Sequence, residues 1–150
     1  MSQTPLSETH KELLDAAHAA REHSHAPYSK FKVGAAVLSS SGHTYTGSNV
    51  ESSSYGLTIC AERLALCLAV HEGNFDIVAI AVVADATGAP GPCGACRQFM
   101  YDFAPQAQVI MSNLKGETRQ VGVQELIPWG FGPDDLLKRP PSEAAESTEP

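Results

Sequence analysis

Apolar residues recur every three or four positions in three stretches of the chain, which is the period of an α-helix with one buried face. The first stretch begins after Ser7 or Thr9, either of which can serve as the N-cap. It ends before the Ala-Pro pair at 26–27, because the residue before a proline disfavours helical backbone. The same spacing predicts helices at 60–72 and 95–103.

Short apolar runs alternate with these helices and predict strands. The run at 76–84 is apolar at nearly every position, which is typical of a strand covered on both faces. Residues 31–38 and 43–48 are separated by a Ser-Gly turn and predict a hairpin, and further strands are expected at 108–111 and 118–122. The alternation predicts an α/β fold, a three-layer α/β/α sandwich around a mixed, roughly five-stranded sheet.

Length and charge narrow the class of protein. A chain of 150 residues is expected to form one domain, at 1–138, and the acidic, Pro-rich stretch at 139–150 is expected to be disordered. A net charge of −7 disfavours a nucleic-acid partner, because such partners are bound through basic residues. No apolar run reaches the length of a membrane span and no signal-peptide core is present, so a cytoplasmic protein is expected.

The candidate chemistry lies in two short motifs, Cys60-Ala61-Glu62 and the run from Pro92 to Cys96, PCGAC. Three thiols, Cys60, Cys93 and Cys96, predict one Zn²⁺ ion per chain with a free fourth position, which is the pattern of catalytic rather than structural zinc. Glu62 is close enough to reach a water in that position without being a ligand. A first ligand, a nearby Glu and then P-C-x-x-C form the signature of zinc nucleobase deaminases.

Three thiolates would leave the zinc centre with a net charge of −1 and weaken it as a Lewis acid, so charge must be withdrawn from the sulfurs. Cys60 and Cys93 are expected at helix N-termini, where free N–H groups favour thiolate. Arg63 and Arg97 are candidate hydrogen-bond donors to the sulfurs, and Arg63 is the stronger candidate. Cys67 lies two turns beyond Cys60 and is expected to be a small core residue.

Four blocks extend the pattern over most of the chain, from about 28 to 136: YSKFKVGAAV, GSNVESSSYGLTICAERLAL, GPCGACRQ and LIPWGFGPDDL. In order and spacing they resemble the small, homotetrameric cytidine deaminases. The resemblance implies hydrolysis of cytidine and deoxycytidine to uridine and deoxyuridine in pyrimidine salvage, by a homotetramer with shared active sites.

The resemblance also implies roles for individual residues. Cys60, Cys93 and Cys96 would bind zinc, and Glu62 would be the proton shuttle. The implied substrate contacts are Asn49 and Glu51 on the ribose, the Ala61 N–H on the pyrimidine carbonyl, Phe31 on the ring, Tyr55 near the sugar at the subunit boundary, and Phe131 reaching a neighbouring site. Lys32 and Leu64 stand where the family usually has Pro and Thr, and they leave fine substrate preference open.

Other functional hypotheses for the same motifs each conflict with a feature of the sequence. A deaminase for another aminopyrimidine, such as blasticidin S, is disfavoured by the Asn49-Val50-Glu51 triplet, which suits a ribose. A polynucleotide editor is disfavoured by the negative charge.

A zinc-stapled binding module without catalysis requires a fourth protein ligand that is not evident nearby. A redox dithiol at Cys93 and Cys96 leaves Cys60-Ala61-Glu62 unexplained. Trp129 suits core or interface packing equally.

Overall fold

The sheet has five strands in the order β2-β1-β3-β4-β5 in the computed structural model, which describes residues 6–137. The strand bounds are β1 Val33–Ser39, β2 Thr44–Ser48, β3 Ile77–Ala84, β4 Gln108–Asn113 and β5 Thr118–Gly122. Only β3 and β4 run parallel, whereas the other neighbouring pairs are antiparallel. The expected mixed five-stranded sheet is therefore confirmed.

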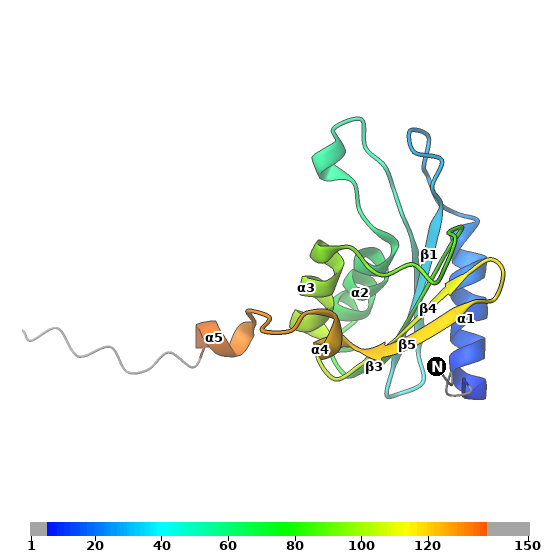
Figure 1. Ribbon diagram of the computed structural model, residues 1–150. Helices are drawn as coiled ribbons and strands as arrows, with labels where there is room; N and C mark the ends of the chain where they lie inside the picture. Colours follow the sequence, from blue (N-terminus) through cyan, green and yellow to red (C-terminus); the bar gives the residue numbers. More distant parts are fainter. Residues whose placement is uncertain (1–5, 138–150) are drawn as a thin grey trace, which may run out of the picture.

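The helices cover both faces of this sheet. Their bounds are α1 Glu8–Arg21, η1 Tyr55–Leu57, α2 Ala61–His71, α3 Gly94–Phe103, α4 Val123–Leu126 and α5 Pro133–Leu137. Figure 1 shows α1 on one face, α2 and α3 on the other, and α5 extending away from the sheet. The three-layer α/β/α arrangement is confirmed.

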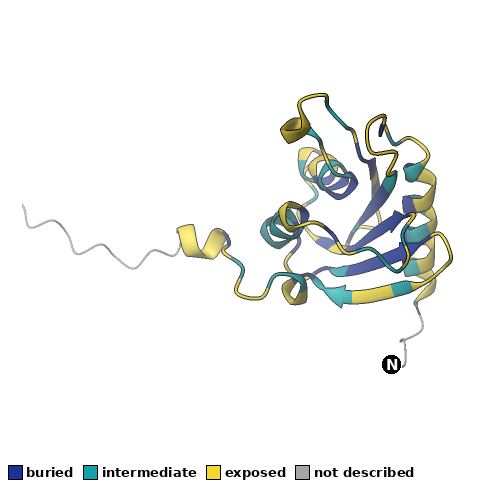
Figure 2. Cartoon of the chain, turned by 45° about the horizontal axis from the view of Figure 1, so that its top comes forward, coloured by how far each residue is buried: buried dark blue, intermediate teal, exposed yellow. Residues whose placement is uncertain are grey.

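Alternation along the central strands divides the core into two halves. The side chains beneath α2 and α3 include Ala35, Val37, Ile80, Val82, Val109 and Met111. Those beneath α1 are mostly smaller and include Ala36, Ala79, Ala81, Val83 and Ile110. Because successive strand residues point to opposite faces, each central strand serves both halves. Figure 2 accordingly shows the central strands buried and β5 partly exposed at the sheet edge.

Two glycines let helices approach the sheet closely on opposite faces. A Cβ added at Gly34 would lie 2.0 Å from the backbone oxygen of Ala17 in α1. A Cβ added at Gly47 would lie 2.5 Å from the backbone oxygen of Ala61, the first residue of α2. Both separations are shorter than any real contact, so either side chain would force its helix outward.

The N-terminal helix begins as expected but ends earlier. Ser7 is its N-cap and accepts a hydrogen bond from the His10 backbone N–H. The helix stops at Arg21 rather than near the Ala-Pro pair at 26–27, because the following segment pairs with the chain around Val50. The isolated parallel bridge between His25 and Val50 records that pairing.

The expectation that Cys67 is a core residue is wrong. Cys67 is exposed, because the buried side of α2 is formed by Ala61, Glu62, Ala65, Leu66 and Ala69. The prediction of disorder at 139–150 falls outside the described residues. Among residues 6–137, none of the helices combines the length and apolar character that a membrane span needs.

Candidate active site

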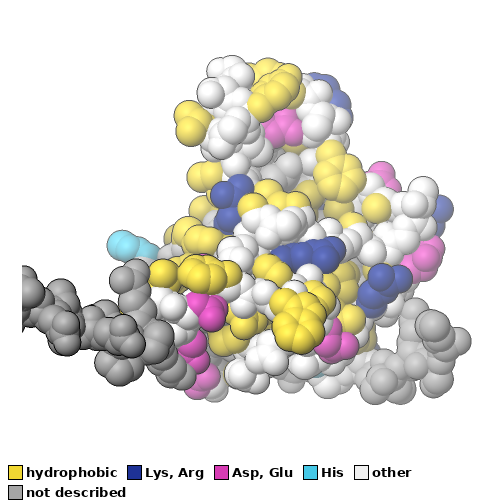
Figure 3. All heavy atoms as spheres, turned by 60° about the vertical axis from the view of Figure 1, so that its left-hand side comes forward, with side chains coloured by type: hydrophobic (Ala, Val, Ile, Leu, Met, Phe, Trp, Pro, Cys, Tyr) yellow, Lys and Arg dark blue, Asp and Glu magenta, His cyan; other side chains and the backbone are white. Residues whose placement is uncertain are grey.

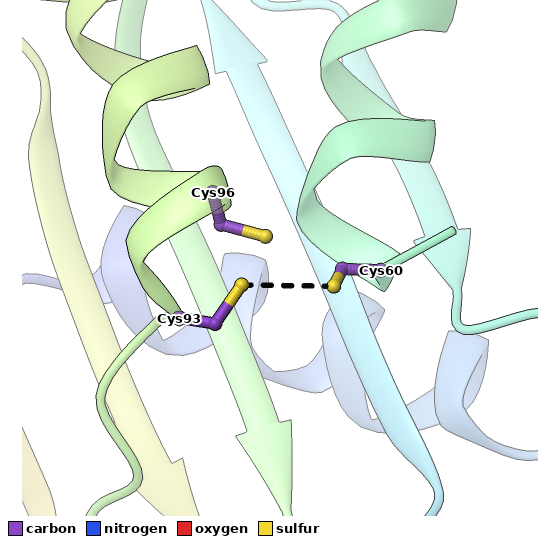
Figure 4. Close-up of side chains that lie close together, drawn as sticks. All are labelled: Cys60, Cys93 and Cys96. Carbon is purple, nitrogen blue, oxygen red and sulfur yellow. Dashed lines mark hydrogen bonds between the residues drawn. The ribbon is translucent and has the colours of Figure 1, made fainter. Parts of the chain in front are cut away.

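The three predicted thiols come together at the start of two helices. Cys60 is the N-cap residue of α2, Cys93 is the N-cap of α3, and Cys96 lies in the first turn of α3. Their sulfur atoms all lie within 4.8 Å of one another, and the Cys60 and Cys93 sulfurs are 3.8 Å apart. Figure 4 shows the three side chains converging from the two helices. The expected helix-N-terminal position of Cys60 and Cys93 is confirmed.

The donor set and its geometry fit zinc. Two sulfurs bound to one tetrahedral zinc at Zn–S distances of about 2.3 Å would be separated by about 3.8 Å. That separation matches the distance between the Cys60 and Cys93 sulfurs. Within residues 6–137, the one group of His, Cys, Asp or Glu side chains suited to a metal is this triad, with no fourth member. The site therefore suits a zinc ion with an open position.

Arg63 contacts the cluster directly. Its Nη2 donates to the Thr58 carbonyl at 3.0 Å and to the Cys60 sulfur at 3.7 Å. Hydrogen bonds from Cys96, Arg63 and Cys93 outweigh burial and lower the pKa of the Cys60 thiol to about 5. The hydrogen bond to Cys60, together with burial, raises the pKa of the Cys96 thiol. Of these two thiols, Cys60 is thus the one stabilised as thiolate.

Arg97, which was a candidate donor to the sulfurs, binds backbone oxygens instead. Its Nε donates to the Pro92 carbonyl at 2.8 Å, and its Nη1 donates to the Leu126 carbonyl at 3.0 Å. Both acceptors are backbone oxygens. Among the described residues, Arg97 forms no hydrogen bond to a sulfur. Arg97 thereby ties the segment before Cys93 to the end of α4.

Glu62 lies in the first turn of α2 beside the thiols and is only 5% exposed. Burial raises the pKa of its carboxyl group, and the neighbouring Cys60 adds to the rise, while hydrogen bonds from its own backbone N–H and from Cys96 oppose it. A carboxyl group with a raised pKa can hold a proton and release it again, as a general acid and base must.

A cavity of about 310 Å³ joins the thiol cluster to the loop before α2. It is lined by Ser29, Phe31, Val33, Asn49, Glu51, Thr58, Cys60, Ala61, Glu62, Val82, Ala84, Pro90, Gly91 and Cys93. The lining includes Phe31, Asn49, Glu51 and Ala61, which the sequence resemblance assigned to substrate. Small-molecule sites commonly have such a volume and such a mainly apolar lining with a few polar groups.

The loops that contribute Ser29, Asn49 and Glu51 to this lining are held by hydrogen bonds. Glu51 accepts from the backbone N–H groups of Tyr28, at 2.9 Å, and Ser29, at 3.2 Å, and also from the Ser29 hydroxyl. These bonds, with that from the Ser29 hydroxyl contributing most, lower the pKa of the Glu51 carboxyl group. Asn49 is buried, and its Nδ2 donates to the Phe31 carbonyl at 2.8 Å.

Two predicted site residues lie outside the cavity of their own chain. Tyr55, in η1, is 72% exposed and packs against the ring of Tyr28, with centroids 5.7 Å apart. Phe131 follows α4, is 59% exposed, and its carbonyl accepts from Gln98 at 2.7 Å. Lys32 is also absent from the cavity lining. Within one chain, therefore, the structure does not bring Tyr55 and Phe131 to the thiols.

The cavity also contains polar residues that were not singled out from the sequence. Ser29 and Thr58 line it, and Ser24 hydrogen-bonds to Asn49 just behind it. Ser29 stands inside one of the four sequence blocks, so that block could have drawn attention to it. Ser24 lies before every block, and no sequence signal marks it.

Comparisons with known proteins agree with this site. The model of the cytidine and deoxycytidylate deaminase zinc-binding region matches residues 7–112. A cytidine deaminase of Halalkalibacterium halodurans is 48% identical over 125 residues, covering 83% of this chain and 95% of the relative. A probable cytidine deaminase of Dictyostelium discoideum is 41% identical over 134 residues, covering 89% of this chain and 90% of the relative.

A solved structure gives the same result. The crystal structure of cytidine deaminase from Burkholderia pseudomallei matches with a TM-score of 0.80 and 46% identity, covering 81% of this chain and 98% of that one. The sequence resemblance is thus confirmed over a stretch that contains the thiol cluster, Glu62 and the cavity. The chain belongs to the cytidine and deoxycytidylate deaminase family.

Proposed function

We propose that the protein hydrolyses cytidine and deoxycytidine to uridine and deoxyuridine, releasing ammonia. The observation that carries this proposal is the buried Glu62 carboxyl group beside three clustered thiols, in a cavity whose lining also includes the polar loop residues Asn49 and Glu51. This arrangement offers ligands for a metal, a proton carrier and a nucleoside-sized space in one place.

Cys60, Cys93 and Cys96 would hold one zinc ion per chain, and Arg63 would withdraw charge from the Cys60 sulfur. When bound, zinc supplies a Lewis acid that activates water at neutral pH. Glu62 takes a proton from the attacking water and delivers it to N3 of the pyrimidine as the oxygen adds to C4. Glu62 then carries the second water proton to the exocyclic amine, the C4–N bond breaks, and ammonia leaves as the C4 carbonyl forms. The same carboxyl group therefore acts first as base and then as acid.

The remaining lining residues would hold the nucleoside. The Ala61 N–H is free for the pyrimidine carbonyl, because the first N–H groups of a helix have no partner within it. Phe31 would pack on the pyrimidine ring. Asn49 and Glu51 would bind the sugar hydroxyls, since they are polar residues of the cavity lining on a segment outside the helices that carry the thiols.

We further propose a homotetramer in which neighbouring chains complete the sites. Large apolar side chains are exposed on η1, α2 and the segment after α4, among them Tyr55, Leu57, Leu68, Trp129 and Phe131. Figure 3 shows hydrophobic side chains gathered over this side of the molecule. Exposed apolar surface of this kind commonly marks an interface between proteins. Tyr55 and Phe131 would then reach sites that they do not reach within one chain.

Cytoplasmic pyrimidine salvage is the setting that we propose. The described chain has four cysteines and none of them forms a disulfide, which suits a reducing compartment. The net charge of −7 suits a free nucleoside better than a polynucleotide.

The deciding experiment follows the ultraviolet absorbance of cytidine and deoxycytidine mixed with zinc-loaded protein. We expect rapid conversion by the wild type, and a kcat reduced about 10³-fold in Glu62→Gln, because a single proton-transferring group contributes about 10²–10⁴-fold. Zinc content should stay near one ion per chain in both. Glu12→Gln, an exposed carboxylate on α1, is the matched control and should behave as wild type. Failure of the zinc-loaded wild type to convert either nucleoside would disprove the proposed function.

A further inference from the structure

The chain after α1 is tied to the loop that carries Asn49 and Glu51. The His25 backbone N–H donates to the Asn49 carbonyl at 3.0 Å, and the Glu51 backbone N–H donates to the His25 carbonyl at 2.8 Å. These two bonds form the His25–Val50 bridge. They place Ser24, the preceding residue, directly behind the Asn49 side chain.

The Asn49 amide is almost fully occupied by protein partners. Its Oδ1 accepts from the Ser24 hydroxyl at 2.5 Å and from the Val33 N–H at 2.9 Å. An amide oxygen has two lone pairs, so both are taken. Its Nδ2 donates one hydrogen to the Phe31 carbonyl at 2.8 Å, which leaves one N–H. Because Asn49 lines the cavity, that N–H is the only polar group it can offer to a ligand.

We propose that Ser24 is a positioning residue that fixes Asn49 as a hydrogen-bond donor to a sugar hydroxyl at C2′ or C3′ of the nucleoside. The inference rests on the proposed function and names a residue outside the cavity lining. Ser24 acts in two ways. Its hydroxyl occupies the lone pair through which Oδ1 could otherwise accept, and by donating to Oδ1 it polarises the amide, which strengthens the remaining N–H as a donor.

Glu51 supplies the complementary half of this arrangement. Its carboxylate already accepts from Tyr28 and Ser29, yet a carboxylate has about four acceptor positions and therefore retains capacity. Since Asn49 can only donate and Glu51 can only accept, the pair matches a sugar hydroxyl, which does both. A nucleoside without hydroxyls at C2′ and C3′ would gain nothing from this pairing.

The test compares Ser24→Ala with wild type on cytidine and on 2′,3′-dideoxycytidine. Loss of one hydrogen bond typically changes an equilibrium about fivefold. We expect KM for cytidine to rise about fivefold while kcat changes little, and we expect no rise in KM for dideoxycytidine, which lacks the hydroxyls at C2′ and C3′. Ser24→Thr keeps the hydroxyl and should restore the wild-type KM for cytidine.

Ser41→Ala is the matched control. Ser41 also hydrogen-bonds through its hydroxyl, but it lies at the β1–β2 turn, beyond the end of β1 that is farther from the cavity. An equal change for both nucleosides in Ser24→Ala would show a merely structural role and overturn the inference. An unchanged KM for cytidine would overturn it as well. If the wild type itself converts no nucleoside, the proposed function fails, and this inference fails with it.

Discussion

Two parts of the cavity lining are held in place by different means: the metal end, with the thiols and Glu62, and the sugar end, with Asn49 and Glu51. At the metal end, each of the four chemical groups sits at the start of a packed helix, and all come from two motifs of three and five residues. At the sugar end, the polar groups lie on loops and are held by hydrogen bonds between segments that are 16 to 25 positions apart. The metal end is thus positioned by helix packing, and the sugar end by a hydrogen-bond network.

This difference separates two kinds of functional defect. Changes at the metal end should reduce zinc content or kcat, because they alter the reacting groups. Changes at the sugar end should mainly raise KM, because they alter the contacts that hold the nucleoside. Variants at each end therefore show whether the two ends respond separately.

Removal of a thiol at the metal end should have the largest effect. In Cys93→Ala we expect zinc content well below one ion per chain and activity reduced at least about 10³-fold, because two protein ligands hold zinc poorly and water is no longer activated. Zinc analysis and steady-state rates measure both. Cys67→Ala is the control, since Cys67 is exposed on α2 and outside the cluster. Full zinc and full activity in Cys93→Ala would remove Cys93 from the metal site.

Neutralisation of the Glu51 carboxylate at the sugar end should have the second largest effect. Glu51→Gln replaces an acceptor-only group with one that also donates, so the sugar hydroxyl loses its charged acceptor. Hydrogen bonds to charged groups are the stronger ones, and we expect KM for cytidine to rise at least about tenfold. Zinc content and kcat should remain close to wild type. A reduced kcat at unchanged KM would contradict the separation of the two ends.

Gly47 and Gly34, which lie against α2 and α1, allow each end of the site to be displaced through its supporting helix. Gly47→Ala would push α2, which carries Glu62, whereas Gly34→Ala would push the end of α1 near Ser24. Overpacking a core typically costs about 1–3 kcal/mol, so both should lower the unfolding free energy by a similar amount in urea denaturation. We expect Gly47→Ala to lower kcat and Gly34→Ala to raise KM. Identical kinetic defects in the two variants would show that the ends are not independent.

The same difference explains which parts of the site could be predicted from the sequence. Cys60, Glu62, Cys93 and Cys96 stand in short motifs whose spacing carries the chemistry, and helix periodicity placed them at N-termini. Ser24 could not be found, because its role arises only when the chain after α1 crosses to Asn49.

The sheet and the three long helices were predictable because each has a hydrophobic period over several turns or along a whole strand. The one-turn elements η1 and α5 were not, since three to five residues are too few to show a period. Cys67 was misjudged because seven-residue spacing from Cys60 does not identify the buried side of α2. That side became evident only from the contacts of Ala65, Leu66 and Ala69.

The smallest effect is expected at Phe131, which tests whether the substrate site is completed by another chain. Phe131→Ala removes an aromatic side chain that is absent from the cavity of its own chain. We expect KM for cytidine to rise about fivefold, within the range for loss of one aromatic contact, with kcat and zinc content unchanged.

Mixed assemblies identify the chain that Phe131 serves. Phe131→Ala chains retain Glu62, whereas Glu62→Gln chains retain Phe131 but cannot transfer protons, so turnover in a co-expressed, purified mixture comes from the Phe131→Ala chains alone. If Phe131 reaches a neighbouring site, an excess of Glu62→Gln chains should return the KM of that turnover to the wild-type value. If Phe131 serves its own chain, the KM of the mixture should stay as high as in Phe131→Ala alone. Restoration would therefore mean that Phe131 of one chain completes the substrate site of another, so that this site is complete only in the assembly.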